Sequence, residues 1–297
     1  MNNNHFHSYL IIIRGFDMRK LLLATLLAGS FGSAMADPKG VVMDFGALDT
    51  IEALGGSSSV SALPKEFAPE YLEKYQSAEY KLSGDMFKLD MDLIRQENPD
   101  FIIISGRQGR SAAELQSIAP VINFSAANDD YIESVKYNIL AVGKAIGKEA
   151  EAKTALEKLD AKIKAAQEKS AASKQKAIVV MHNDGNVGLI NHSGYATLVH
   201  DVAGVKRADE KKHEGRVAAD AKYLTEVNPD IIYVVDRSAA IGAKPLDENY
   251  FKAKELENVK AVKNADVIYL TPKLWYLSGK GLQSIDLQVE EVMTPIK

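Results

Sequence analysis

The chain contains an internal repeat. Residues 90–107 read DMDLIRQENPDFIIISGR, and residues 220–237 read DAKYLTEVNPDIIYVVDR. Each copy begins with Asp, continues with apolar residues at helical spacing, turns at Asn-Pro-Asp, runs through a β-branched stretch and ends on Arg. Proline ends a helix, and a continuous β-branched run is typical of a parallel strand covered on both faces. The repeat therefore predicts two α/β units of one design.

Further strand-like runs flank the repeat. VVMDF (41–45) and AIVVM (177–181) each open one half, and VINF (121–124) and VIYL (267–270) each follow a helical segment. Each half therefore reads β-α-β-α-β. Between them, the Ala-, Glu- and Lys-rich stretch 129–170 has strong helix propensity.

We expect an α/β fold of two parallel-sheet lobes bridged by a long helix, with a cleft between the lobes. The alternative is that these helices cover one large sheet. The expected divisions are an N-terminal lobe at 37–127, a linking helical region at 128–172 and a C-terminal lobe at 173–297.

The N-terminus resembles an export signal. Arg19 and Lys20 precede a short apolar run, and Ala34-Met35-Ala36 forms a small-x-small cleavage site. The run is shorter than the roughly 20 residues of a membrane span. We expect a signal peptide cleaved after Ala36, an extension of unclear use at 1–17, no membrane span in the mature chain and a periplasmic location. The alternative is an N-terminal membrane anchor.

Composition excludes several classes. The net charge of -4 and the absence of a basic stripe argue against a nucleic-acid partner. The chain has no Cys, which excludes disulfides, thiolate metal sites and a lipid-modified N-terminal Cys. No GxSxG or strand-linked GxGxxG motif is present, so we expect that the protein is not an enzyme. We also expect a monomer.

Two arginines end the two copies of the repeat. Arg107 and Arg237 follow equivalent strands, and ligands of open α/β sheets bind at the carboxyl ends of the strands. If both face one cleft, they imply an anionic ligand, because guanidinium groups match carboxylate, phosphate or catecholate oxygens. The alternative is that each arginine pairs with a local carboxylate, such as Asp236 beside Arg237.

Aromatic residues follow the last predicted strand. The segment 271–284 carries the only Trp, Trp275, with Tyr276 and Lys280. This pattern suits an aromatic ligand or a metal–phenolate bond, or else core packing. His213 lies in a polar loop, where it is either solvated or available with Tyr276 to complete the coordination of a ferric ion.

Five segments together resemble a known family. These segments are MDFGALDTIEALG (43–55), NPDFIIISGRQ (98–108), HDVAGV (200–205), NPDIIYVVDRSAAIG (228–242) and LWYLSGKGLQS (274–284). On these segments the chain resembles the periplasmic ferric-siderophore-binding proteins of ABC importers, and most of all the catecholate type.

The resemblance implies roles for the candidate residues. It implies that cleft arginines, here Arg107 and Arg237, neutralise a ferric catecholate, and that Tyr276 and His213 bind iron when the siderophore offers only four donors. Tyr195 stands where close relatives carry a third arginine, and Lys280, Arg110 or Arg216 could compensate for the missing charge.

The resemblance also implies partners. The ferric siderophore would be a ligand rather than an intrinsic cofactor, and an inner-membrane ABC permease would receive it. Glu114 and Glu248, which we expect at the starts of equivalent helices, are candidates for docking to that permease, or else solvated surface carboxylates. Haem, another anionic iron chelate or, less in keeping with the sequence, a periplasmic hydrolase activity remain alternatives.

Overall fold

A computed structural model describes residues 36–86, 88–125, 130–192 and 194–297. The expected extension at 1–17 and all of the expected signal peptide except Ala36 lie outside the described residues. None of the helices within the described ranges is both long and apolar enough to cross a membrane.

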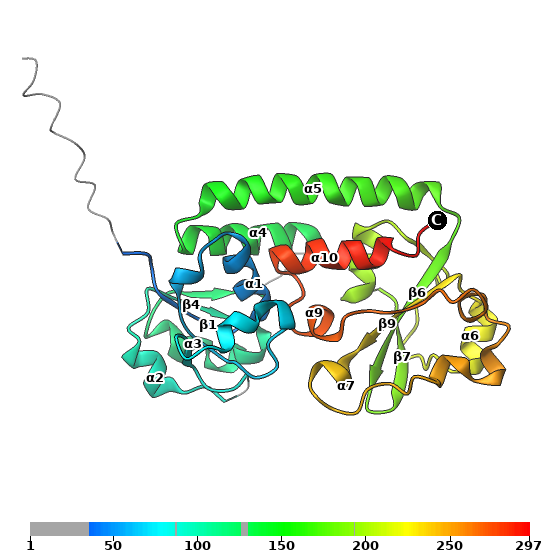
Figure 1. Ribbon diagram of the computed structural model, residues 1–297, viewed down its shortest axis with the longest axis horizontal. Coiled ribbons are helices and arrows are strands. Elements are labelled where there is room, and N and C mark those ends of the chain that lie inside the picture. Colours follow the sequence, from blue (N-terminus) through cyan, green and yellow to red (C-terminus); the bar gives the residue numbers. More distant parts are fainter. Residues whose placement is uncertain (1–35, 87, 126–129, 193) are drawn as a thin grey trace, which may run out of the picture. The chain divides into compact units, whose positions relative to one another are not determined.

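The first half of the chain builds a five-stranded sheet whose neighbouring strands all run parallel, in the order β3-β2-β1-β4-β5 (Figure 1). Its strands are β1 (Gly40–Val42), β2 (Val60–Leu63), β3 (Lys81–Leu82), β4 (Phe101–Ile104) and β5 (Val121–Asn123). Its helices are α1 (Phe45–Ala53), α2 (Met91–Gln96) and α3 (Ala112–Gln116), with short 3-10 helices η1 (Ser57–Ser59), η2 (Glu70–Gln76) and η3 (Gly106–Ser111).

The second half builds a sheet in the order β10-β9-β6-β7, with β8 paired to β6. Its strands are β6 (Lys176–Asn183), β7 (Asn186–Ile190), β8 (Lys206–Arg207), β9 (Ile231–Asp236) and β10 (Val267–Tyr269). Its helical segments are η4 (Thr197–Val202), α6 (Ala221–Val227), α7 (Arg237–Ala240), η5 (Tyr250–Lys252), η6 (Lys254–Leu256), α8 (Lys260–Lys263), α9 (Pro272–Tyr276) and α10 (Leu282–Met293).

One strand pair departs from the expected β-α-β pattern. β6 continues directly into β7 and pairs with it antiparallel, with Asn183 opposite Asn186. The two residues between them, Asp184 and Gly185, have φ of 51° and 77°. An Asp-Gly pair with two positive φ angles is the sequence signal of a tight hairpin, and glycine tolerates this conformation without strain.

Two helices link the halves. α4 (Tyr131–Ala145) packs on α1, and the 24-residue α5 (Glu149–Ala172) packs on α4 and α10. Figure 1 shows α5 running alongside elements of both halves. Its last turns contact the second half through hydrogen bonds from Gln167 to the Val202 carbonyl (2.9 Å) and from Ser170 to the Ala203 carbonyl (2.7 Å). The expected fold, two α/β lobes bridged by a long helix, is confirmed.

The repeat has the same local structure in both halves. Asp90 and Asp220 cap α2 and α6 by accepting backbone N–H groups at 3.0 and 2.9 Å. Asn98 and Asn228 follow these helices with φ of 44° and 46°, the left-handed conformation that asparagine adopts more readily than most residues. The Asn-Pro segment therefore ends each helix at the same point of the repeat.

The aspartate after each proline pins a central strand. Asp100 accepts the N–H of Lys39 at 2.8 Å, just before β1. In the second half, Asp230 accepts the N–H of Lys176 at 2.9 Å, at the start of β6. The Asn-Pro-Asp motif thus aligns the first strand of each half with the strand that carries the cleft arginine.

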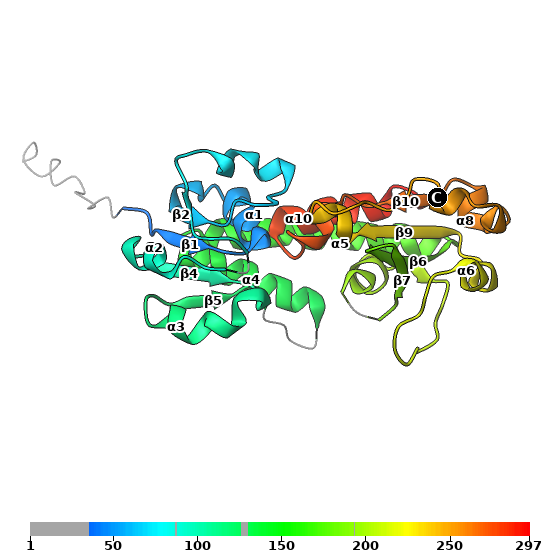
Figure 2. The same ribbon diagram turned by 90° about the horizontal axis from the view of Figure 1, so that it is seen from below.

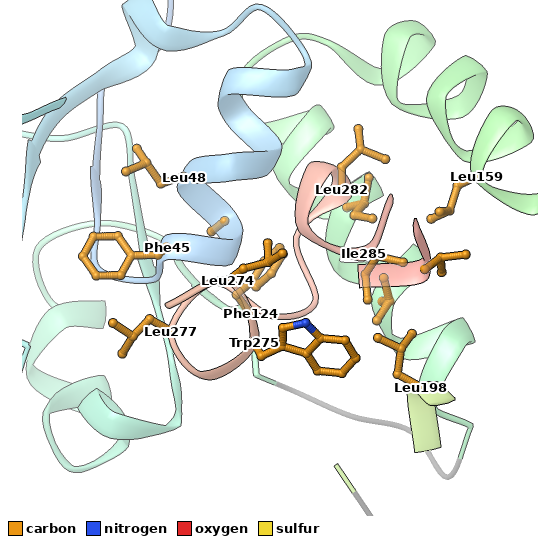
Figure 3. Packing of buried hydrophobic residues seen from close by; sticks show 14 of the residues in the cluster. Phe45, Leu48, Phe124, Leu159, Leu198, Leu274, Trp275, Leu277, Leu282 and Ile285 are labelled. Atoms are coloured by element: carbon orange, nitrogen blue, oxygen red, sulfur yellow. The ribbon is translucent and has the colours of Figure 1, made fainter. Parts of the chain in front are cut away.

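A shared apolar core joins the halves. One cluster of buried residues includes Ile103 of β4, Tyr233 of β9 and Val289 of α10, whereas the other face of each sheet has its own separate cluster. Figure 3 shows residues from α1, α5, α9 and α10 packed around Trp275. The two lobes therefore rest on common helices rather than on a flexible linker.

The C-terminal helix is capped by the first half of the chain. The N–H groups of Gln283 and Leu282 donate to Asp49 (2.8 Å) and Thr50 (3.1 Å) of α1. Gly281 permits this approach, because a Cβ atom there would lie 2.4 Å from the Gly46 carbonyl oxygen. α10 lies beside α1 in both views of the ribbon (Figures 1 and 2). Residues 281–283 and α10 therefore complete the packing of α1.

Candidate functional site: a pocket between the two halves

Arg107 projects from a rigid turn at the carboxyl end of β4. Ser105 caps η3, and the Gln108 side chain accepts the Ser105 N–H at 2.9 Å, which completes a capping box. Gln108 also donates to the Met86 carbonyl at 2.7 Å. The backbone is thus fixed, while the Arg107 side chain itself is exposed.

Arg237 occupies the equivalent place after β9 and is held more firmly. Its Nε donates to the Tyr276 hydroxyl at 2.7 Å, and its Nη1 donates to Asn183 Oδ1 at 2.6 Å. The neighbouring Asp236 accepts from Ala239 N–H and is paired with His182 at 2.8 Å. The expected alternative, in which Asp236 neutralises Arg237, is therefore not what the structure shows.

Both arginines converge on Tyr276, at the end of α9. The guanidinium carbons of Arg107 and Arg237 lie 5.9 and 5.3 Å from the centre of the Tyr276 ring, within cation–π range. Within the described residues, neither arginine forms an ion pair with a carboxylate. Two cations from opposite halves of the chain thus meet with no described carboxylate within ion-pair distance, which suits an anionic ligand.

A pocket of about 160 Å³ opens beside Arg107. It is lined from both halves of the chain, including the linking helix α4 and the segment after α9. The lining residues are Asp44, Arg107, Ser125, Tyr131, Gly194, Tyr195, Leu198, Trp275, Tyr276, Leu277, Gly279, Lys280 and Gln288. Five of the seven residues expected to contact a ligand are in this set, and Arg237 adjoins it through Tyr276.

Trp275 serves both the core and the pocket. Its side chain is 1% exposed, and its Nε1 donates to Glu291 at 2.7 Å. Tyr195 stacks edge-on against it, with ring centres 6.2 Å apart. Burial, reinforced by the negative charge that Tyr276 would carry when ionised, raises the pKa of Tyr195, so Tyr195 contributes a neutral hydroxyl to the pocket.

Lys280 adds a third positive charge. Its Nζ lies 5.5 Å from the centre of the Tyr131 ring, and its backbone has φ of 78°. α10, whose first N–H groups donate to Thr50 and Asp49 of α1, begins two residues later. The position of Lys280 in the pocket therefore depends on the contact between α1 and α10.

Three residues that bear on the chemistry of the site were not predicted from the sequence: Asp44 and Gln288, which line the pocket, and Asn183, which contacts Arg237. Asp44 caps α1 and is 7% exposed, and burial raises its pKa to about 6, against the lowering effect of the Ala47 N–H and Arg107. Gln288 is 2% exposed, and its Oε1 has no hydrogen-bond partner within the described residues. Asn183 orients Arg237. The Asp-Phe-Gly segment shows a capping aspartate, but nothing in the sequence places it in a pocket.

His213 is not brought to Tyr276. It lines a separate hollow with Tyr223 and Glu226, and its Nε2 lies 2.7 Å from Asp209 Oδ2. The Tyr223 hydroxyl donates to the same oxygen at 2.8 Å. Burial alone would raise the pKa of Asp209, but these contacts and the Lys211 N–H lower it below its usual range. His213 is thus tied to its own lobe, away from the expected pairing.

The two glutamates expected at equivalent helix starts are not equivalent. Glu114 is the third residue of α3, and its carboxylate pairs with Arg95 at 2.7 Å. Glu248 is exposed in the segment before η5, on the rim of an apolar hollow with Tyr269. Among the described residues, no group of three or more His, Asp or Glu side chains could hold a metal ion on its own.

The chain belongs to a family of periplasmic binding proteins, whose family model matches residues 42–274. This is a family of substrate-binding transport proteins, which agrees with a ligand pocket between two α/β halves.

Individual relatives are siderophore-binding proteins. The petrobactin-binding protein YclQ of Bacillus subtilis is 36% identical over 86% of this chain and 81% of its own length. Its crystal structure has a TM-score of 0.82, covering 88% of this chain and 92% of that one. The ferric-anguibactin-binding protein FatB of Vibrio anguillarum is 25% identical over 84% and 80% of the two chains. The catecholate-siderophore-binding protein VctP of Vibrio cholerae is 28% identical, with a TM-score of 0.76, over 86% and 93%.

Proposed function

We propose that this protein captures a ferric siderophore with catecholate-type oxygen donors in the pocket at Arg107 and delivers it to an inner-membrane ABC permease. The observation that carries the proposal is the convergence of Arg107 and Arg237 on Tyr276 with no carboxylate partner within the described residues. The names of YclQ, FatB and VctP support the same class of ligand.

The residues expected to contact the ligand have different roles in this proposal. Arg107, Arg237 and Lys280 supply positive charge, and guanidinium groups also stack on aromatic faces. Trp275 and Tyr195 offer ring surface to the catechols. Tyr276 would supply a phenolate to iron when the siderophore provides only four donors. We assign no iron bond to His213 in this arrangement, because Asp209 holds its Nε2.

The direct test is a titration of Trp275 fluorescence with defined chelates. Ferric bis-catecholate and tris-catecholate complexes should quench it with saturable binding, while a neutral ferric trihydroxamate should bind much more weakly. Tyr276→Phe should weaken the bis-catecholate more than the tris-catecholate, because only the former leaves iron positions open. Equal losses for both would refute the phenolate bond, and no binding of either anionic complex would refute the proposed ligand class.

Haem is the second candidate ligand, since Tyr276 is also a usable axial ligand. The absorption spectrum separates the two: haem gives a sharp Soret band on binding, whereas a ferric catecholate gives a broad visible band. The proposal also includes a monomeric state and the absence of catalysis. Turnover assays on ester and phosphate substrates, together with light scattering, address both points.

Location and docking complete the proposal. We propose a periplasmic location, with the signal peptide removed after Ala36, which N-terminal sequencing of the exported protein would test. Docking to the permease through Glu114 and Glu248 is tested by reversing both charges. Unchanged uptake of iron by cells that carry the double variant would dismiss these two residues, and the Arg95 contact already occupies the Glu114 carboxylate.

A further inference from the structure

One acid lies among the cations of the pocket. Asp44 follows β1 by two residues, caps α1 through a hydrogen bond from the Ala47 N–H at 3.0 Å, and lines the same pocket as Arg107 and Lys280. The backbone N–H of Gly46 also stabilises the ionised carboxylate. An ionised carboxylate at this place opposes the very ligand that the arginines attract.

The surroundings of Asp44 are otherwise positive or neutral. Arg107 faces it from η3 and Lys280 from the segment before α10. The other ionisable residues lining the pocket are tyrosines, namely Tyr131 of α4, Tyr195 and Tyr276. The other buried acid on α1, Asp49, is committed to Tyr71 and Gln283. Burial and backbone hydrogen bonds act on the charge of Asp44, and so do two cations that a ligand would engage.

We propose that Asp44 is a ligand-discriminating residue: it carries a proton whenever an anionic chelate occupies the pocket, so that capture of the ligand takes up a proton. The inference rests on the proposed function and adds a residue and a proton to it. A bound anion engages Arg107 and Lys280 and brings negative charge into a partly desolvated site, where Coulomb interactions are strong. Both changes favour the neutral carboxyl group, which donates to a ligand oxygen instead of repelling it.

The direction of the pH effect follows from this cycle. In the free protein, burial raises the pKa of Asp44 to about 6, so the group is mostly ionised at pH 7.5. Binding raises the pKa further. Between the two pKa values, capture takes up one proton and the affinity falls about tenfold for each pH unit. Below pH 6 the group is already protonated, and the affinity levels off.

The substitution Asp44→Asn tests the proposal cleanly. Asparagine caps a helix as well as aspartate does, so α1 should be retained, which urea unfolding can verify. Asp220→Asn is the matched control, because Asp220 caps α6 in the same manner but is exposed and outside the pocket. Calorimetry with a ferric tris-catecholate at pH 5.5, 6.5 and 7.5, in buffers of different ionisation enthalpy, measures affinity and proton uptake together.

We expect the wild-type protein and Asp220→Asn to take up close to one more proton than Asp44→Asn at pH 6.5 to 7.5. Asp44→Asn should bind the tris-catecholate about thirtyfold more tightly than wild type at pH 7.5 and almost equally well at pH 5.5, and it should gain nothing for a neutral ferric trihydroxamate. The chelate's own titration cancels in the comparison of variants. Identical pH profiles for Asp44→Asn and wild type, or weaker binding by the variant at every pH, would overturn this inference alone. No binding by wild type at any pH would overturn the proposed function and the inference with it.

Discussion

Arg107 and Arg237 end the two copies of one repeat, yet they are held differently. Arg237 is half-buried and fixed by Asn183 and the Tyr276 hydroxyl, whereas Arg107 is exposed and its side chain makes a long, 3.5 Å hydrogen bond to the Tyr276 carbonyl and a cation–π contact with the Tyr276 ring. The two copies of the repeat thus share the strand and turn that present an arginine, but the contacts of the arginine side chain differ between them. The guanidinium group of Arg237 is already oriented in the free protein, whereas a ligand must fix the side-chain conformation of Arg107.

The largest expected effect separates the two arginines by affinity. Arg237→Ala should weaken binding of a ferric tris-catecholate by about 3 kcal/mol and Arg107→Ala by about 1.5 kcal/mol, the two ends of the range for hydrogen bonds to charged groups. The difference arises because a pre-oriented side chain loses less entropy on binding. Fluorescence titration of both variants measures it, and a larger loss for Arg107→Ala would reverse the comparison.

The next effect concerns the Asn-Pro-Asp motif, which both halves contain. Asp100→Ala and Asp230→Ala should each lower the free energy of unfolding by about 1.5 kcal/mol, because each removes a carboxylate acceptor for a strand N–H. Urea unfolding of the two variants gives both values. If one variant is neutral and the other costly, the two Asn-Pro-Asp motifs are alike in geometry only.

A smaller effect probes the strand pair found in the second half alone. Gly185→Ala should destabilise the protein by about 1 kcal/mol, since φ at this residue is 77° and alanine resists positive φ. No described atom lies within 4 Å of the added Cβ, so a loss of stability would come from the backbone conformation and not from a steric clash. Thermal unfolding is the measurement, and an unchanged midpoint would mean that the turn relaxes to another geometry.

The smallest effect asks whether Asn183 accounts for the advantage of Arg237. Asn183→Ala should weaken binding by about 1 kcal/mol in the wild type and have almost no effect once Arg237 is alanine. The full double-mutant cycle measures this coupling. Additive losses would show that Asn183 acts on the ligand by itself rather than through the arginine.

Much of this arrangement could be predicted from the sequence, because the signals were local or repeated. Asn-Pro-Asp followed by a β-branched run and Arg predicts the strands and the placement of both arginines. The Asp184-Gly185 pair, which indicates a tight hairpin, was also present in the sequence. We instead expected the second half to repeat the β-α-β pattern of the first. The tight hairpin after β6 was therefore missed.

The rest depends on contacts between distant segments. No spacing in the sequence shows that Asp44 and Gln288 line one pocket, because their elements meet only after α10 packs on α1. Similarly, the polar composition around His213 does not reveal that Asp209, four residues earlier, and Tyr223 hold it on its own lobe. Residue type predicted a possible metal ligand, and tertiary structure determined its partner.

The capping of α10 by Asp49 and Thr50 has a consequence for the newly made protein. The first sheet and its helix α1 are synthesised early, but the helix that α1 caps comes from residues 282–293, more than 230 residues after the capping side chains. Until α10 is synthesised, α1 lacks its packing partner and Asp49 has only the Tyr71 hydroxyl of these contacts. The first half of the fold therefore reaches its final packing only after residues 282–293 have been synthesised, so folding of the two halves is coupled through α10.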